Sequence, residues 1–332
     1  MNGGEMRTRP RFPGVPREAA HYESFYLKAS HPTEPLGFWI RHTVHKRPGA
    51  EPTGSLWFVL FSADGPLASK TTMPGSKLGA DGGEYIHIGQ SVLTAGQATG
   101  AAPSEQLDAS WDLAFSSSER PLHHLPREWM YERSLPRTKS LSPYPAARFS
   151  GSVQAGNRRV EVDGWRGMVG HNWGTEHAER WIWLQGSGFE GHEDDWLDLT
   201  VGRVKLGPLT TPWIANGAIS IGGERHRVGG IERARKTEVA ESPAGAELVI
   251  PAKELTLRLS VGAPRECFVG WVYADPAGPE HNAVNCSIAG LTATVDRGGE
   301  ESLRLATSHG AAYELGMRET DHGIAVQPFP DG

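Results

Sequence analysis

Alternation of apolar and polar residues over short stretches is the main structural signal in this chain. In the stretch 37–44, Phe38, Ile40 and Val44 fall on one face of an extended strand, and Arg41 and Thr43 fall on the other. The stretch 110–115 repeats this pattern, with its large apolar side chains on one face. No apolar pattern indicates an amphipathic helix longer than three turns. The alternation therefore predicts an all-β protein.

Turn residues separate the apolar stretches. The 332 residues include 41 Gly and 24 Pro, and pairs such as Gly222-Gly223 and Gly229-Gly230 mark tight turns. The stretch 55–61 is apolar throughout and too short for a typical helix, which indicates a buried strand. Strands are expected at 23–28, 37–44, 55–61, 84–88, 110–115, 147–152, 160–165, 181–185, 196–201, 213–221, 247–250, 255–261, 267–273, 284–288 and 313–315.

The strand pattern stops between residues 119 and 145. Five prolines interrupt this segment, and proline cannot donate a hydrogen bond to a sheet. We expect a long surface crossover with little regular structure, joining two antiparallel units. The predicted division is a flexible tail at 1–20, one β-barrel at 21–160 and another at 161–330. Barrels are favoured because closure removes exposed sheet edges.

Composition and charge narrow the function classes. The net charge of −6 gives no electrostatic attraction to nucleic acid, so no nucleic-acid partner is expected. No apolar run approaches the roughly 20 residues of a membrane-spanning helix, and residues 1–17 lack the apolar core of a secretory signal. Cys267 and Cys286 lie in apolar runs, which favours buried thiols over a disulfide bond. A cytoplasmic protein is therefore predicted; its oligomeric state is left open.

The stretch 170–185 carries the densest candidate chemistry. Within sixteen residues it combines wide aromatic rings with polar groups, as a small-molecule pocket requires, although the same mixture also suits a β-barrel core. The candidate substrate-binding residues are Asn172, Glu176, Trp181, Trp183, Gln185 and Thr200. In a strand, Trp181, Trp183 and Gln185 share one face. Trp196, Asp198 and Thr200 share a face of the next expected strand.

Four residues are candidates for catalysis: His171, Trp173, Trp196 and Asp198. A carboxyl group between indoles and away from water can stay protonated and act as an acid, so Asp198 is the first candidate. The alternative is an exposed, ionised Asp198. His171 could orient a neighbouring carboxyl group or carry a proton; alternatively, it is a core histidine bonded to the backbone. Glu176 and His177 form a weaker pair that a charged turn would also explain.

Neither a metal nor a cofactor is expected from the motifs. His42 and His45 point to opposite faces of a strand, which prevents joint ligation, and the spacings of His123 with His124 and of His171 with His177 do not resemble a structural zinc site. The chain contains no nucleotide-binding glycine motif and no Gly-x-Ser-x-Gly nucleophile motif.

The stretches 23–28, 37–43 and 55–61 resemble the opening of the tandem-lipocalin proteins related to carotenoid 1,2-hydratase (hydroxyneurosporene synthase). That group includes AttH-like proteins, tocopherol-cyclase-like proteins and fungal Diels–Alderases. The stretches 170–174, 181–189 and 196–212 resemble a block of its AttH-like branch. The resemblance spans roughly residues 20 to 320 and implies two lipocalin-like (calycin) antiparallel β-barrels, side by side, with a hydrophobic cavity.

The resemblance also implies site residues. The hydratases carry a His-x-Trp pair, matched here by His171 and Trp173, and a later aromatic-x-Asp pair, matched by Trp196 and Asp198. The aromatic residue of the second pair is usually Tyr, and Trp196 has no phenol hydroxyl. Fold is implied more firmly than function, because one fold hosts many activities.

Together these observations lead to one functional hypothesis and two alternatives. The hypothesis is cofactor-independent acid catalysis on a hydrophobic isoprenoid or polyene, by a hydratase (hydro-lyase), isomerase or cyclase acting through a carbocation. Asp198 would protonate the double bond, and His171 would orient Asp198 or activate water. The first alternative is a non-catalytic carrier or sensor of a hydrophobic small molecule. The second is a structural protein without a cavity.

Overall fold

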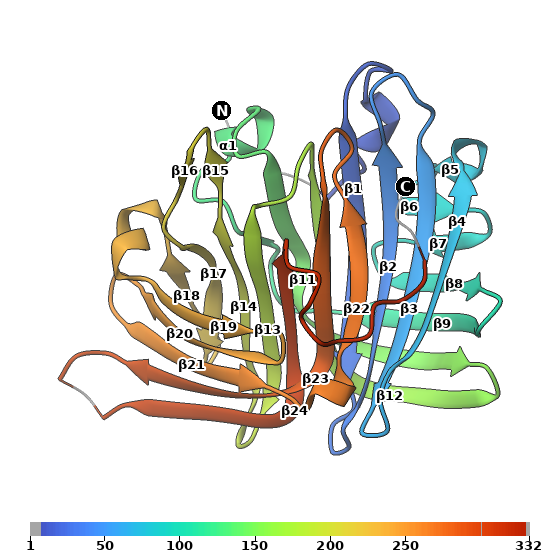
Figure 1. Cartoon of the computed structure of the whole chain (residues 1–332). Coiled ribbons are helices and arrows are strands. Elements are labelled where there is room, and N and C mark those ends of the chain that lie inside the picture. Colours follow the sequence, from blue (N-terminus) through green and yellow to red (C-terminus); the bar gives the residue numbers. More distant parts are fainter. Residues whose placement is uncertain (1–7, 300, 330–332) are drawn as a thin grey trace.

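The computed structural model describes residues 8–299 and 301–329. As the alternation predicts, nearly all its regular structure is β-strand, and the named strands pair antiparallel (Figure 1). The helical segments are short. They are η1 (Phe12–Gly14), η2 (Gly75–Lys77), α1 (Trp129–Glu132), η3 (Ile231–Lys236) and η4 (Arg265–Cys267).

The first half of the chain forms one 12-stranded sheet in the order β4-β3-β2-β1-β12-β11-β9-β8-β7-β6-β5, with β10 beside β11. Its strands are β1 (His21–Ser30), β2 (Leu36–Lys46), β3 (Thr53–Ser62), β4 (Leu67–Pro74), β5 (Leu78–Gly79), β6 (Ile86–Ile88), β7 (Ser91–Leu93), β8 (Gln97–Pro103), β9 (Asp108–Ser116), β10 (Leu122–His123), β11 (Thr138–Ala155) and β12 (Arg158–Gly174). The sheet curls into a nearly closed barrel. Across the gap, the Ser69 hydroxyl of β4 donates a hydrogen bond to the Ala102 carbonyl of β8 at 2.6 Å.

The second half forms a 10-stranded sheet in the order β18-β17-β14-β13-β24-β23-β21-β20-β19, with β22 beside β23. Its strands are β13 (Arg180–Phe189), β14 (His192–Arg203), β17 (Ile214–Ile221), β18 (Glu224–Gly229), β19 (Glu238–Ser242), β20 (Gly245–Pro251), β21 (Thr256–Gly262), β22 (Val269–Ala274), β23 (Glu280–Asp296) and β24 (Leu303–Met317). A small hairpin, β15 (Lys205–Leu206) and β16 (Leu209–Thr210), extends from it. This sheet also curls, because Val228 of β18 bridges to Ala252, which directly follows β20.

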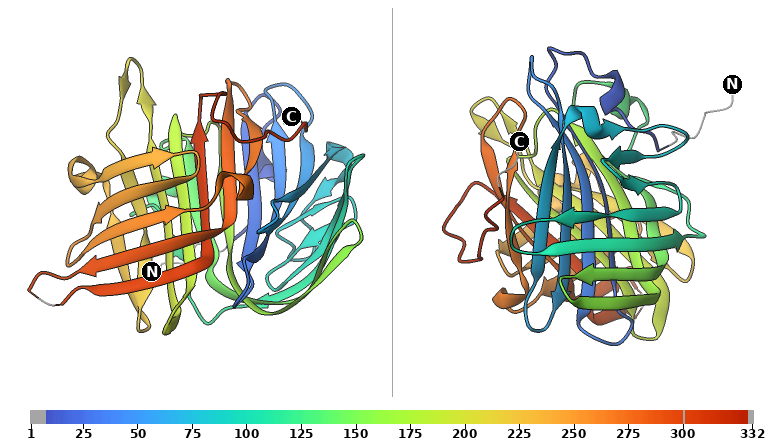
Figure 2. Two further views of the ribbon diagram at one scale, coloured as in Figure 1. Left: turned by 60° about the horizontal axis from the view of Figure 1, so that its bottom comes forward. Right: turned by 90° about the vertical axis from the view of Figure 1, so that its right-hand side faces the viewer.

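The two sheets pack face to face along β1–β3 of the first and β22–β24 of the second (Figures 1 and 2). Alternate residues of β1 therefore enter different cores. Phe25 lies in the core of the first barrel, and its neighbour Tyr26 lies in the core shared with the second sheet. Both faces of β1 and β2 are buried along their whole length. The apolar stretch 55–61 lies in β3 and is buried, as predicted.

The segment 119–145 contains more structure than its prolines indicated. It includes β10 and α1, and β11 begins at Thr138. Pro143 and Pro145 lie inside β11, where the pairing with β12 shifts register on either side of Tyr144. A residue at such a bulge needs no ladder hydrogen bond, so proline is tolerated there. The expectation of an irregular crossover up to residue 145 was wrong for this reason.

The change from one sheet to the other falls between Gly174 and Arg180, because β12 pairs with β1 and β11. The division into two domains at residues 160 and 161 stays a prediction. Residues 1–7 of the expected tail lie outside the described residues. The remainder is anchored, because the backbone N–H groups of Arg11 and Phe12 donate hydrogen bonds to the Glu23 carboxylate.

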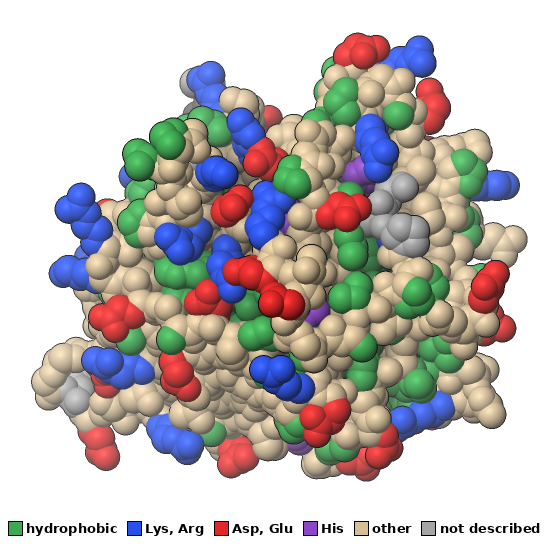
Figure 3. Space-filling view, in the orientation of Figure 1, with side chains coloured by type: hydrophobic (Ala, Val, Ile, Leu, Met, Phe, Trp, Pro, Cys, Tyr) green, Lys and Arg blue, Asp and Glu red, His purple; other side chains and the backbone are tan. Residues whose placement is uncertain are grey.

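Surface and thiol features also bear on the sequence predictions. Within the described residues, no helix is long and apolar enough to cross a membrane. On the face shown in Figure 3, basic and acidic side chains are interspersed, without a large region of one sign. Cys267 and Cys286 are both buried free thiols, as the sequence favoured.

Candidate active site

The imidazole of His171 is buried and paired with a carboxylate. Strand β12 places His171 directly opposite Phe25 of β1. Its Nε2 lies 2.7 Å from Oε1 of Glu23. The ring stacks on Phe25 with a centroid distance of 3.9 Å and on Trp173 at 4.5 Å. These contacts hold the ring in one orientation.

Glu23 is fully buried and surrounded by hydrogen-bond donors. Its carboxylate accepts backbone N–H bonds from Arg11 at 2.9 Å and from Phe12 at 2.7 Å, and Nε2 of His21 lies 3.3 Å away. Burial alone would raise the pKa of Glu23, but the hydrogen bonds from His171 and His21 lower it to about 2. Glu23 is therefore an anion in the folded protein.

The Glu23 carboxylate determines which nitrogen of His171 carries a proton. Burial lowers the pKa of His171 despite the opposing effect of Glu23, so the ring is neutral at pH 7. A neutral imidazole bonded to a carboxylate through Nε2 carries its proton there, which leaves Nδ1 as an acceptor. Nδ1 is buried and has no hydrogen-bond partner among the described residues. This pair has the composition of an oriented general base.

The carboxyl group of Asp198 forms a second, separate cluster. Strand β14 holds Asp198 with no exposed surface. Its Oδ2 accepts a hydrogen bond from the Ser142 hydroxyl at 2.5 Å and lies 3.5 Å from Nε2 of His124. Its Oδ1 is buried and has no hydrogen-bond partner in the part of the chain that the structure describes. The same His124 nitrogen faces both Ser142, at 3.1 Å, and Asp198, so the three do not form the relay that activates a serine nucleophile.

His171 and Asp198 lie on opposite faces of the first sheet. Successive residues of a strand point to opposite faces. Phe25 stacks on His171 inside the first barrel, whereas Tyr26 faces the second sheet, where burial and then the nearby Asp198 raise its pKa. The predicted partnership in which His171 orients Asp198 is therefore not formed. His171 instead pairs with Glu23. The polar neighbours of Asp198 are Ser142 and His124.

The candidate indoles divide between these two regions. Trp173 packs with Tyr131 and Leu141 on the His171 side. Trp183 contacts Tyr26 edge-on at 5.1 Å in the layer between the sheets. Trp196 is buried with Leu122 and Ala218, and the Arg225 guanidinium lies 5.0 Å from its ring centroid.

The candidate polar residues have different surroundings. Gln185 is buried with Oε1 unpartnered, and Thr200 is half-buried with its hydroxyl 3.4 Å from the Asn216 carbonyl. Asn172 is half-buried on β12, with its Oδ1 unpartnered. Glu176 instead forms an ion pair with Arg137 near the surface. Trp181 lies beside His177 and donates to Glu314 at 3.0 Å.

Sequence reasoning missed four polar residues around these clusters. Glu23, Tyr26, His124 and Ser142 all bond or approach the candidate residues through tertiary contacts only. Only Glu23 gave a local signal, as the one acid of the expected strand 23–28. Among the described residues, one group of histidine and carboxyl side chains could share a metal ion: His177, Asp275 and His281.

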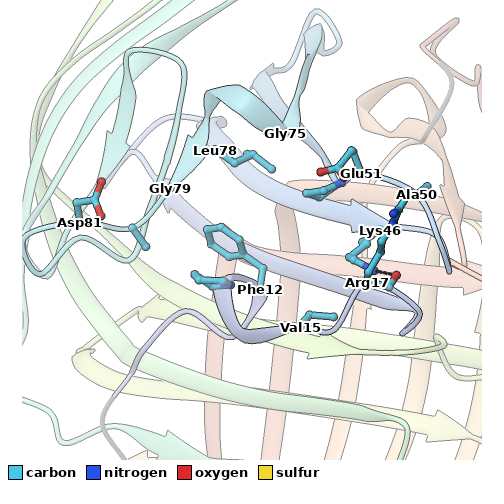
Figure 4. Close-up of a pocket in the computed structure, with 13 residues that line it drawn as sticks. Phe12, Val15, Arg17, Lys46, Ala50, Glu51, Gly75, Leu78, Gly79 and Asp81 are labelled. Carbon is cyan, nitrogen blue, oxygen red and sulfur yellow. Dashed lines mark hydrogen bonds between the residues drawn. The ribbon is translucent and has the colours of Figure 1, made fainter.

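A pocket opens at one end of the first barrel, with a volume of about 510 Å³. Figure 4 shows Phe12 and Leu78 on its apolar side and Arg17, Lys46 and Glu51 on its polar side. Phe12 also donates its backbone N–H to Glu23. The pocket therefore adjoins the segment that holds the Glu23–His171 pair.

Comparisons with known proteins identify the fold. No protein-family model matches the chain. Two uncharacterized proteins of Mycobacterium tuberculosis, from strains CDC 1551 / Oshkosh and ATCC 25618 / H37Rv, are each 27% identical over 319 residues, which cover 94% of this chain and 90% of theirs. An AttH-like protein from Nitrosomonas europaea has a similar structure, with a TM-score of 0.58, 12% identity and coverage of 95% and 98% of the two chains. Kievitone hydratase from Nectria haematococca is also similar, with a TM-score of 0.51, 10% identity and coverage of 91% and 90%. These likenesses support the lipocalin-like fold that the sequence resemblance implied.

Proposed function

We propose that this protein is a cofactor-independent acid catalyst acting on a carbon–carbon double bond of a hydrophobic isoprenoid or polyene. The observation that carries the proposal is the carboxyl group of Asp198, which is fully buried and has one oxygen without a partner. The Ser142 hydroxyl and the His124 imidazole lie beside its other oxygen, so the carboxyl group is held in place to act as a proton donor.

The reaction starts with proton transfer from Oδ1 of Asp198 to one carbon of the double bond. The second carbon becomes a cation, and Asp198 becomes a carboxylate whose Oδ2 accepts the Ser142 hydrogen bond. In a hydration, water adds to the cation and returns a proton to Asp198, so one water molecule is consumed. Loss of a different proton instead gives isomerisation, and attack by a second double bond gives cyclisation.

Aromatic rings on the same side of the first sheet supply the stabilisation that a carbocation needs. Tyr26 and Trp183 lie in the layer between the sheets, and Trp196 is two residues from Asp198 on β14. Each indole face that meets a cation contributes about 0.5–2 kcal/mol. Trp173 and His171 lie on the other face of the sheet, so the proposal assigns them no contact with this cation.

The fold comparisons support the reaction class without naming a substrate. Kievitone hydratase is a hydratase by name, and its fold is similar to that of this chain. Tyr26 close to Asp198 and Trp196 on the same strand favour a hydrophobic substrate. We therefore favour hydration as the reaction. Isomerisation and cyclisation would begin with the same proton transfer and differ only in how the cation is consumed.

The test uses deuterium incorporation, because every variant of the reaction begins with proton transfer to carbon, whatever the product is. The protein is incubated in D2O with a panel of terpenoids, carotenoids and unsaturated fatty acids, and mass spectrometry detects deuterium gained at carbon. We expect incorporation with wild type and a loss of at least 100-fold with Asp198→Asn. Asp195→Asn, which changes a buried acid of the same strand bonded to His192, is the matched control and should retain turnover. Near wild-type turnover by Asp198→Asn would refute the acid role.

The same panel separates a catalyst from a carrier. Quenching of tryptophan fluorescence reports binding independently of chemistry. Binding without deuterium incorporation in wild type would favour the alternative of a non-catalytic carrier or sensor. Absence of both signals would favour a structural protein.

A further inference from the structure

Three side chains that the proposed function does not use meet where the chain passes from the first sheet to the second. His177 lies in the crossover before β13, Asp275 directly follows β22, and His281 lies in β23. One ligand atom from each residue lies within 4.8 Å of the other two. The sequence separates His177 from the other two residues by about a hundred positions, so only the fold brings them together.

A hydrogen-bonded pair explains part of this cluster. The backbone N–H and Nδ1 of His177 both lie 2.7 Å from Oδ1 of Asp275. Those contacts orient the carboxyl group and leave its other oxygen, Oδ2, buried and without a hydrogen bond.

His281 is not explained by that pair. Its side chain is fully buried, and within residues 8–299 and 301–329 neither ring nitrogen makes a hydrogen bond of good geometry; the Ala178 backbone offers only a weak one. Its Nδ1 lies 3.7 Å from Oδ2 of Asp275, which is beyond hydrogen-bond distance. Buried polar atoms are nearly always satisfied by protein, water or an ion. The His281 ring and Oδ2 of Asp275 therefore face each other, and a single ion between them would satisfy both.

We propose that His177, Asp275 and His281 bind one divalent first-row transition metal ion of the zinc class. Two imidazoles and one carboxylate are a ligand set that such ions prefer, and three protein ligands leave a position for water. Ligand bonds of about 2.0–2.2 Å require the three ligand atoms to lie roughly 3 to 3.5 Å apart. The His177–Asp275 pair must open slightly and His281 must move inward by about an ångström.

The surroundings are built like the outer shell of a metal site. Tyr22 stacks on His177 with a centroid distance of 4.1 Å, and Trp181 stacks on it at 5.3 Å. Trp181 also meets His281 edge-on at 5.2 Å. These rings fix the imidazoles and limit water, while the 11% exposed side chain of His177 leaves a route for the ion. A bound ion would link the crossover to β22 and β23.

The test is a metal titration of the full chain after removal of metal by a chelator. We expect one Zn²⁺ per chain by calorimetry, a rise in Tm on binding, and, with Co²⁺, visible d–d bands of a site with nitrogen and oxygen ligands. The variants His281→Gln and Asp275→Asn should each weaken Zn²⁺ binding by at least about 100-fold, since even outer-shell changes cost 10- to 100-fold. His87→Gln is the matched control, because it changes a histidine that also contacts a carboxylate, Glu84, but lies near the surface.

Each outcome decides the proposal. The 14 histidines of the chain give a background of weak binding, so binding that the two ligand variants retain would overturn it. Circular dichroism shows whether these variants fold. If they do not fold, the test rests on Co²⁺ titration of wild type. Trp181 lies beside two of the ligands, so Co²⁺ bound at this site would quench its fluorescence. Absence of stoichiometric binding and of Co²⁺ bands in wild type refutes the site. Failure of Asp198 catalysis would leave this proposal unaffected.

Discussion

Replacement of Glu23 by glutamine tests how strongly the buried carboxylate stabilises the fold. Glutamine keeps the shape and one acceptor but loses the charge, and its amide group meets N–H donors from Arg11 and Phe12. The side-chain NH2 group of glutamine and a backbone N–H group, both donors, then face each other in a buried site. We expect Glu23→Gln to be clearly destabilised at pH 7.

The magnitude follows from the pKa of Glu23, which falls from 4.5 to about 2 on folding. A carboxyl group with a lowered folded pKa stabilises the protein above its unfolded pKa and loses that contribution as the pH falls through the folded value. A difference of about 2.5 units corresponds to about 3 kcal/mol at pH 7. By pH 3 about half of this remains. Wild type should therefore lose its advantage over the variant on acidification.

Urea denaturation followed by tryptophan fluorescence, at several pH values between 3 and 7, measures this difference. Glu161→Gln is the control, since Glu161 forms an exposed ion pair with Arg159 and should change stability by less than about 1 kcal/mol. A wild-type advantage that stayed below about 1 kcal/mol at pH 7, or did not decrease between pH 5 and 3, would refute the account of Glu23 as a buried anion.

Two further predictions concern residues that pack between the sheets. Lys28 is fully buried, and burial lowers its pKa from 10.5 to about 7. Between these two pH values the unfolded chain therefore binds more protons at Lys28 than the folded chain does. In urea denaturation, the stability of wild type relative to Lys28→Met should therefore rise by about 1.4 kcal/mol per pH unit from pH 7.5 to 9. A flat difference would show that Lys28 stays charged. In Gly170→Ala the new Cβ would lie 2.2 Å from the Tyr26 ring, so a loss of about 1–3 kcal/mol is expected, against little change for Gly96→Ala, where the nearest atom is 3.6 Å away. Equal thermal stability of these two variants would contradict the packing described for Tyr26.

The all-β character was predictable because side-chain direction alternates along a strand wherever one face is buried. This local rule identified the stretches 37–44 and 110–115, which lie in β2 and β9. The expectation that Pro143 and Pro145 exclude a strand was wrong. They lie at a bulge, which depends on the register of the neighbouring strand and not on the local sequence. The local rule also could not show that β1 and β2 are buried on both faces, since a second sheet covers them.

The candidate residues were visible for the same local reason, but their partners were not. The period-two pattern correctly put Asp198 in a strand, and both His171 and Asp198 are fully buried. Which side of the sheet each residue faces depends on where its strand lies in the fold. The predicted pairing of these two residues was therefore wrong.

The amino-acid sequence alone determined the strand content, the turns and the set of chemically useful side chains, because these depend on residues close together in the chain. The tertiary structure decided which groups meet: Glu23 with His171, Ser142 with Asp198, and Asp275 with His177. Such contacts join residues 56 to 148 positions apart. Sheet order and register, which no local pattern encodes, bring them within hydrogen-bond distance.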